Sequence, residues 1–260
     1  MKKISHLIIS ILLLGLTACG STNATVTPEP TTVIGLPVTP VPFYMMVALS
    51  STPATETGTG PDYTIETETP VLVTNGLDPR INPFNDAMVA LVQEEVDSFK
   101  QNIQNLPVTP IVVGSSLQIK FTQVSPPGNL LSLKFIISYY MDGAAHPGST
   151  SRSVTYDLEA GQFVNLDQLF LPGSDYLGMI SAYCIKILKA SEIGEVIDET
   201  GAQPTADYYR NWNVITDGLL ITFDEYQVAL YAAGPQQVTV PYSELAAIID
   251  PQGPLAGYIP

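Results

Sequence analysis

LQIKFTQVSPPGNLLSLKFIISYYMDGAAHPGSTSRSVTYDL, residues 117–158, is the stretch that decides the fold. Three runs rich in aromatic and β-branched residues, 117–124, 130–140 and 151–158, are separated by segments that contain Pro, Gly, Asn and Asp. Runs of this composition that are bounded by turn residues are typical of β-strands. The stretch therefore predicts consecutive strands of a largely antiparallel sheet.

A further strand and a long helix are predicted before this stretch. Residues 63–69, YTIETET, alternate in side-chain character from one position to the next, as in a strand with one buried and one exposed face. Residues 71–73 continue this strand past Pro70. Asn82-Pro83 begins a helix, because Asn is a good N-cap and Pro suits the first helical position. The apolar residues that follow recur every three or four positions, which predicts one face packed on a core. They are Phe84, Met88, Val92, Val96, Phe99, Ile103 and Leu106.

A second helix and more strands are predicted after residue 158. Ser174 is expected to cap a helix that runs to about Leu188, and Asp217-Gly218 is a strong hairpin signal. Runs of strands interrupted by two helices, without strict βα alternation, indicate an α+β fold. We expect largely antiparallel sheets packed against two main helices. The additional strands are expected at 213–216, 219–223, 228–231 and 238–242, with a short closing helix at 243–249.

The N-terminus carries the features of an export signal. Lys2 and Lys3 precede an apolar stretch, 7–16, that is too short to span a membrane. The next residues complete Leu16-Thr17-Ala18-Cys19, which resembles the lipobox of bacterial lipoproteins. That resemblance implies cleavage after residue 18, lipidation of Cys19 and an extracytoplasmic protein anchored to the bacterial cell membrane.

The sequence predicts four segments along the chain. A signal peptide, 1–18, is followed by a disordered Thr- and Pro-rich tether, 19–62, whose composition buries little apolar surface. Within this tether, the apolar residues 43–49 either dock on the folded part as a strand or stay exposed. Two α+β subdomains are expected next, one of strand, helix and strands over 63–147, the other over 148–250.

The charge of the chain excludes one class of partner. Ten Lys and Arg stand against 25 Asp and Glu, and removal of Lys2 and Lys3 with the signal leaves a formal charge of −17. A nucleic-acid binding protein needs a basic face, so nucleic acid is not expected as a partner. A basic protein is compatible with this charge, and so is simple solubility. The acidic residues Glu94, Glu95 and Asp97 lie off the apolar helix stripe and predict a solvated face.

Few residues are available for catalysis or metal binding. His6 falls in the expected signal, so His146 is the mature chain's single histidine, which excludes a multi-histidine zinc site. No motif for a nucleophile elbow, a phosphate loop or a dinucleotide is present, and no cofactor is expected. Cys184 lies in an apolar helical stripe and is expected to be a buried, inert thiol. A hydrolase that uses His146 or a pair of carboxylates stays an alternative.

Several motifs resemble a bacterial family of extracytoplasmic domains. The loop from Tyr140 through Gly143 to His146 and Pro147 is similar to a YxxGxAHP/G signature, and 156–170 resembles its strand, Gly turn and DxLF segment. Residues 223–234, FDEYQVALYAAG, and 240–245, VPYSEL, resemble its closing segment. The family comprises the paired domains of unknown function found in RsiV-type anti-sigma factor ectodomains and PdaC-type peptidoglycan deacetylases.

The resemblance implies a non-enzymatic binding fold in the cell envelope. It implies as partners a cell-wall component such as peptidoglycan or a basic protein such as lysozyme, besides the membrane reached through Cys19. Two alternatives stay open, a cell-wall hydrolase or accessory domain and a structural envelope lipoprotein. The candidate binding residues are Tyr140, Gly143, His146, Tyr226, Tyr231 and Tyr242.

Overall fold

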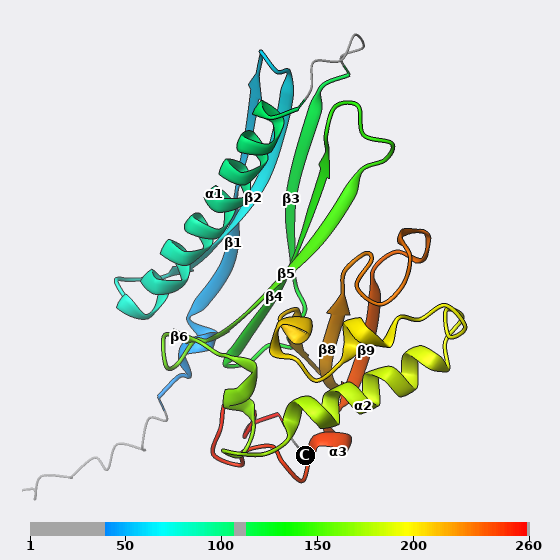
Figure 1. Ribbon diagram of the computed structural model, residues 1–260. Helices are drawn as coiled ribbons and strands as arrows, with labels where there is room; N and C mark the ends of the chain where they lie inside the picture. The colour runs from blue at the N-terminus through cyan, green and yellow to red at the C-terminus, as the bar shows by residue number, and fades with distance from the viewer. Residues whose placement is uncertain (1–39, 107–112, 259–260) are drawn as a thin grey trace, which may run out of the picture. The chain divides into compact units, whose positions relative to one another are not determined.

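The structure, a computed structural model, describes residues 40–106 and 113–258. The expected signal peptide, Cys19 and the first part of the expected tether lie outside these residues. From Val41 onward the chain forms one compact unit built from two sheets (Figure 1). This arrangement confirms the α+β class, with mostly antiparallel sheets and two main helices.

The larger sheet has six strands in the order β1-β2-β3-β4-β5-β6. Its neighbours pair antiparallel except for β2 and β3, which are parallel because the helix α1 (Asn82–Gln104) connects them. The strands are β1 (Val47–Gly58), β2 (Tyr63–Thr74), β3 (Ser115–Gln123), β4 (Leu130–Tyr140), β5 (Gly148–Asp157) and β6 (Gln162–Phe163).

The smaller sheet has three antiparallel strands in the order β7-β8-β9, and α2 (Tyr176–Lys189) packs on β9. These strands are β7 (Trp212–Ile215), β8 (Gly218–Phe223) and β9 (Gln236–Pro241), followed by α3 (Tyr242–Leu245). Short 3-10 turns complete the described part: η1 (Phe43–Met45), η2 (Pro79–Ile81), η3 (Leu166–Leu169), η4 (Glu199–Ala202), η5 (Ala206–Tyr209) and η6 (Tyr231–Ala233). None of the helices in the described residues has the length and apolar content that a membrane span requires.

The first core lies between α1 and one face of the six-stranded sheet (Figure 1). The apolar stripe predicted for this helix is buried from Phe84 to Ile103. It packs against β4 residues of odd number, because alternate residues of a strand point to opposite faces. These are Leu131, Leu133, Phe135 and Ile137.

The second core lies around α2 and the three-stranded sheet, and Leu130 joins it from the opposite face of β4. On that face a buried polar cluster links the two sheets. Asn213 of β7 donates to Ser132 Oγ and to the Leu133 carbonyl, each at 2.9 Å. Its Oδ1 accepts from Ser153 Oγ at 2.9 Å, and Ser132 Oγ also lies 2.9 Å from Thr155 Oγ1. The contact between the sheets is thus fixed by directional hydrogen bonds.

The expected tether is shorter than its composition predicts. Residues 47–58 form β1, which pairs with β2 over twelve residues. Most of its Ser and Thr side chains are exposed, so backbone hydrogen bonds rather than apolar burial hold the strand. Of the two alternatives for residues 43–49, the structure shows docking on the folded part. Phe43 is buried, and the Arg80 guanidinium carbon lies 3.5 Å from the centre of its ring.

Other boundaries also differ from the sequence prediction. A division at 147/148 would separate β4 from β5, yet these strands pair over ten residues of one sheet. The expected strand 228–231 is a loop that leads into η6, where tertiary contacts outweigh the local apolar pattern. Asp175, not Ser174, caps α2 by accepting from the Gly178 amide. The closing helix spans four residues, Tyr242–Leu245.

Candidate functional site

Two loops that are far apart in the sequence meet at the surface. The His146 ring, from the loop between β4 and β5, stacks on Tyr231 with ring centres 3.9 Å apart and planes at 24°. Tyr231 in turn stacks on Tyr226, with centres 5.8 Å apart. We call His146, Tyr226 and Tyr231 the aromatic platform. Of the six predicted contact residues, the structure brings these three together.

Hydrogen bonds hold the loop of residues 224–231 against β5. Asp224 accepts from the Ser151 amide at 2.8 Å, and Glu225 accepts from the Ser149 hydroxyl at 2.9 Å. Across the platform, Tyr231 Oη donates to the Pro147 carbonyl at 2.9 Å. These contacts fix the rings in place before any ligand binds.

The backbone at Tyr226 is strained. Its φ of 66° makes it the one described non-glycine residue with positive φ, and its side chain is 63% exposed. A bulky residue in this conformation costs on the order of 1–2 kcal/mol. The ring is exposed apart from its stacking on Tyr231, so burial of the ring offsets little of that cost.

Gln227 was missed as a positioning residue by the sequence analysis, although it lies inside the FDEYQ motif. Its Nε2 donates to the carbonyls of Gly201 and Tyr208, at 3.0 and 2.9 Å, and so attaches the platform loop to the second core. A polar residue next to an exposed Tyr gave no periodic signal that could have indicated this role.

The three other candidate binding residues lie outside the aromatic platform. Tyr140 is half-buried at the end of β4, opposite Ser116. Gly143 adopts φ 82° in the turn that follows, a conformation that favours glycine. Tyr242 is only 5% exposed and its hydroxyl donates to the Ile215 carbonyl, so it lies in the second core, with little of its side chain open to a ligand.

Within the described residues, no hydrogen bond joins His146 to a serine hydroxyl. His146 Nδ1 lies 2.9 Å from the Pro147 carbonyl. The nearby hydroxyls of Ser149 and Ser153 are bonded to Glu225 and Asn213. Among residues 40–106 and 113–258, no group of three His, Cys, Asp or Glu side chains is placed to hold a metal ion.

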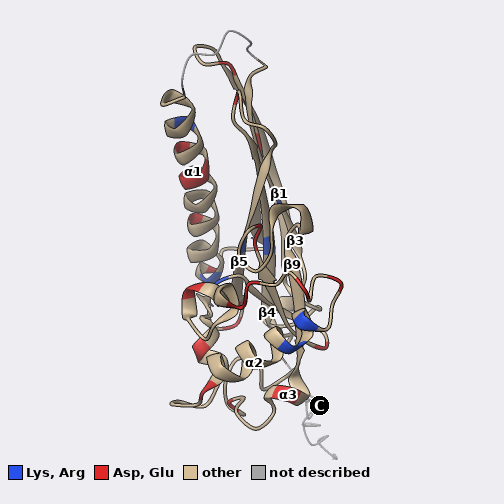
Figure 2. Ribbon diagram, turned by 45° about the vertical axis from the view of Figure 1, so that its right-hand side comes forward, with Lys and Arg blue, Asp and Glu red and all other residues tan. Residues whose placement is uncertain are grey.

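The acidic helix face has an ionic partner. Arg152 of β5 pairs with Glu94 at 3.3 Å and with Glu95 at 2.8 Å. In the ribbon of Figure 2, the positions of Asp and Glu are spread over α1 and the loops, and those of Lys and Arg are fewer. Glu94 and Asp97 are exposed, as expected of a solvated face, whereas Glu95 is partly buried beside Arg152.

Cys184 is buried in the second core, and desolvation raises the pKa of its thiol to about 12. Because thiol reagents attack the thiolate, we expect fewer than roughly one in a thousand native molecules to present a reactive form at pH 8. In a Cys19→Ser chain, Ellman's reagent should label no thiol in the native state and one after denaturation. Rapid labelling of the native chain would contradict this burial.

The segment after β6 matches a known family model, and the fold is shared with solved proteins of that family. Residues 167–243, which contain α2, β7–β9 and the platform loop, match the family model described as "Protein of unknown function (DUF3298)". Solved DUF3298 proteins share the fold. One from Bacteroides fragilis has a TM-score of 0.64 at 17% identity and covers 82% of this chain and 96% of its own. One from Pseudomonas aeruginosa has a TM-score of 0.55 at 14% identity. The match covers 79% of this chain and 95% of the Pseudomonas protein.

Two characterised relatives are distantly similar. Peptidoglycan-N-acetylmuramic acid deacetylase PdaC of Bacillus subtilis is 22% identical over 172 residues, which cover 65% of this chain. The match spans only 37% of the deacetylase. Esterase Rv3036c of Mycobacterium tuberculosis is 24% identical over 169 residues, 63% of this chain and 72% of the esterase.

Proposed function

We propose that this chain is a non-enzymatic, extracytoplasmic binding module that contacts a cell-wall glycan through the aromatic platform. The lipobox resemblance of residues 16–19 supports a lipid anchor at Cys19 and a location at the bacterial cell membrane. The relation to PdaC supports a cell-wall ligand, since that protein's name gives a peptidoglycan sugar as its substrate.

The observation that carries the proposal is the exposed, pre-organised ring of Tyr226. A sugar ring presents C–H groups on its faces, and such groups pack on the negative face of an aromatic ring. Two stacked tyrosines with His146 behind them offer a broad surface of this kind. Because the loops are already fixed, little ordering entropy is lost on binding.

A basic protein such as lysozyme is the second candidate, supported by the excess of 25 acidic over ten basic residues. Binding of this kind is electrostatic and weakens steeply with salt, whereas stacking on the platform does not. Retention on peptidoglycan at 50 and 500 mM salt, compared with retention on immobilised lysozyme, separates the two.

Tyr226→Gly is the sharpest test of the platform. Glycine tolerates φ 66°, so relief of strain offsets the lost stacking, and the free energy of unfolding should stay within about 1 kcal/mol of wild type. Binding to purified peptidoglycan should fall about tenfold in a sedimentation assay. Leu77→Ala removes a fully exposed apolar side chain outside the platform and should leave binding unchanged. Undiminished binding by Tyr226→Gly would refute the platform as the contact site.

The hydrolase alternative has a separate readout. A pure binder releases no soluble fragments from cell walls, and His146→Ala changes nothing in that assay. Turnover that is present in the wild type and lost in His146→Ala would replace the proposal by the hydrolase.

A further inference from the structure

A second feature, distant from the platform rings, is the open outer edge of β5. One side of this strand pairs with β4 over ten residues. The other side pairs with β6 only at Tyr156 and Asp157. Among the residues that the structure describes, no strand pairs with this side of β5 at 148–155, so it is an open sheet edge.

The backbone groups on this edge follow the alternation of an antiparallel strand. The amides of Ser149 and Ser151 point outward to Glu225 and Asp224, and the Thr155 carbonyl points outward to the Val164 amide. Ser153 lies between them with the same orientation. In the described part of the chain, its amide and carbonyl have no hydrogen-bond partner. An exposed pair of this kind can bind another extended backbone.

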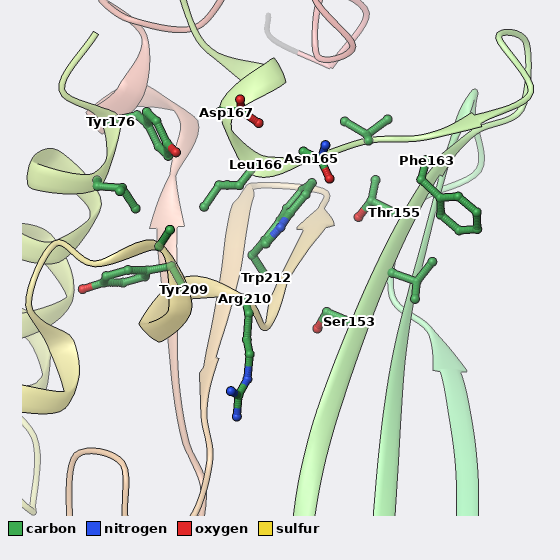
Figure 3. Close-up of a pocket in the computed structure, with 14 residues that line it drawn as sticks. Ser153, Thr155, Phe163, Asn165, Leu166, Asp167, Tyr176, Tyr209, Arg210 and Trp212 are labelled. Atoms are coloured by element: carbon green, nitrogen blue, oxygen red, sulfur yellow. The ribbon is translucent and has the colours of Figure 1, made fainter. Parts of the chain in front are cut away.

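Two adjoining cavities lie along the same edge and share Ser153 and Arg210. One, of about 480 Å³, contains Trp212, Phe163 and Tyr176, and the other, of about 550 Å³, continues toward Arg152. Figure 3 shows Ser153 and Arg210 on opposite sides of the space, with the Trp212 indole between β5 and Leu166. Backbone groups, an aromatic surface and a cation thus line one continuous groove.

Arg210 gives the groove its charge. Its side chain is 69% exposed, and its ion-pair partner, Asp224, lies 3.8 Å away, beyond hydrogen-bond distance. Arg152 on the same groove is already bound to Glu94 and Glu95. Asp167 lies toward the opposite end of the first cavity from the Arg210 guanidinium (Figure 3). A carboxylate is therefore favoured at the Arg210 end and disfavoured at the Asp167 end.

We propose that this groove binds a short, extended peptide with a free carboxylate. The peptide adds to β5 at Ser153 as an extra strand and places its carboxylate on Arg210. Asp224 and Val164 already occupy the edge at Ser151 and Thr155, so three or four residues fill the interval at about 3.3 Å per residue. The site is separate from the glycan contact proposed above and does not depend on it.

The chain's single tryptophan makes the site directly observable. Because Trp212 lines the cavity, its fluorescence should change when the groove is occupied. The full chain is titrated with acetyl-Ala-Ala-Ala, which has a free carboxylate, and with the corresponding C-terminal amide. We expect a saturable change with the acid and about five- to tenfold weaker binding of the amide, which lacks the charge-assisted hydrogen bonds.

Variants assign the two contacts. Arg210→Gln should bind acid and amide equally, whereas Lys189→Gln, which removes a charge outside the groove lining, should keep the preference. Ser153→Pro removes the outward amide and should weaken both peptides. Ser153→Ala loses the same hydroxyl bond to Asn213 but keeps the amide, so it should bind both peptides more tightly than Ser153→Pro. Equal binding of acid and amide by the wild type, no saturable change, or a preference unaffected by Arg210→Gln would each overturn the proposal.

Discussion

Asn213→Ala is expected to lower the free energy of unfolding by about 3 kcal/mol, because the buried contact between the two sheets loses the side-chain amide that joins them. Asn213 is fully buried, and its hydrogen bonds reach Ser132, Leu133 and Ser153 of the larger sheet. Alanine leaves these partners without the amide and adds a small cavity. The urea midpoint of the variant, followed by circular dichroism, measures the loss.

Asn102→Ala is the matched control, since Asn102 lies exposed on α1. Its effect should stay within about 0.5 kcal/mol. If both variants unfolded at the same urea concentration as wild type, the buried cluster would not be what fixes the sheets together.

Gly201→Ala is expected to cost about 3 kcal/mol through overpacking. A Cβ at this position would lie 1.7 Å from the Gln227 carbonyl oxygen, and backbone atoms cannot move away as a flexible side chain can. The segment that moves carries Tyr226 and Tyr231, so peptidoglycan binding should fall together with stability. Thermal unfolding and the sedimentation assay measure the two effects.

Gly76→Ala provides the comparison, because a Cβ there meets no atom within 4 Å. It should be neutral to within about 0.5 kcal/mol. Equal stability of the two variants would mean that the contact between residues 201 and 227 is loose in solution.

Local pattern was sufficient for most of the fold. The apolar stripe from Phe84 to Ile103 and the three strands predicted within 117–158 appear in the structure. The hairpin of β7 and β8 also forms, but it turns at Thr216-Asp217, one residue before the predicted position, and Gly218 is already paired with Ile215. In each of them, periodicity or turn chemistry acts over a few neighbouring residues. The polar strand β1 was not predicted, because its stability comes from pairing with β2 and leaves no apolar pattern in its own side chains.

The candidate site was predictable only in part. His146, Tyr226 and Tyr231 were chosen from motifs. The stack that joins them depends on tertiary contacts such as the hydrogen bond from Tyr231 to Pro147, which are 84 residues apart in the sequence. The β5 edge was missed entirely. Whether a strand has a neighbour on both sides depends on the topology of the sheet, which local sequence does not encode.

The polar cluster on β4 and β5 has a consequence for how the protein is made. Synthesis proceeds from the N-terminus, so the strands up to Phe163 emerge before Trp212 begins β7. We expect the larger sheet to form first, with Ser132, Thr155 and the neighbouring Leu130 still exposed to water. For that interval the surface that later joins the two cores is open to chaperones and to other nascent chains.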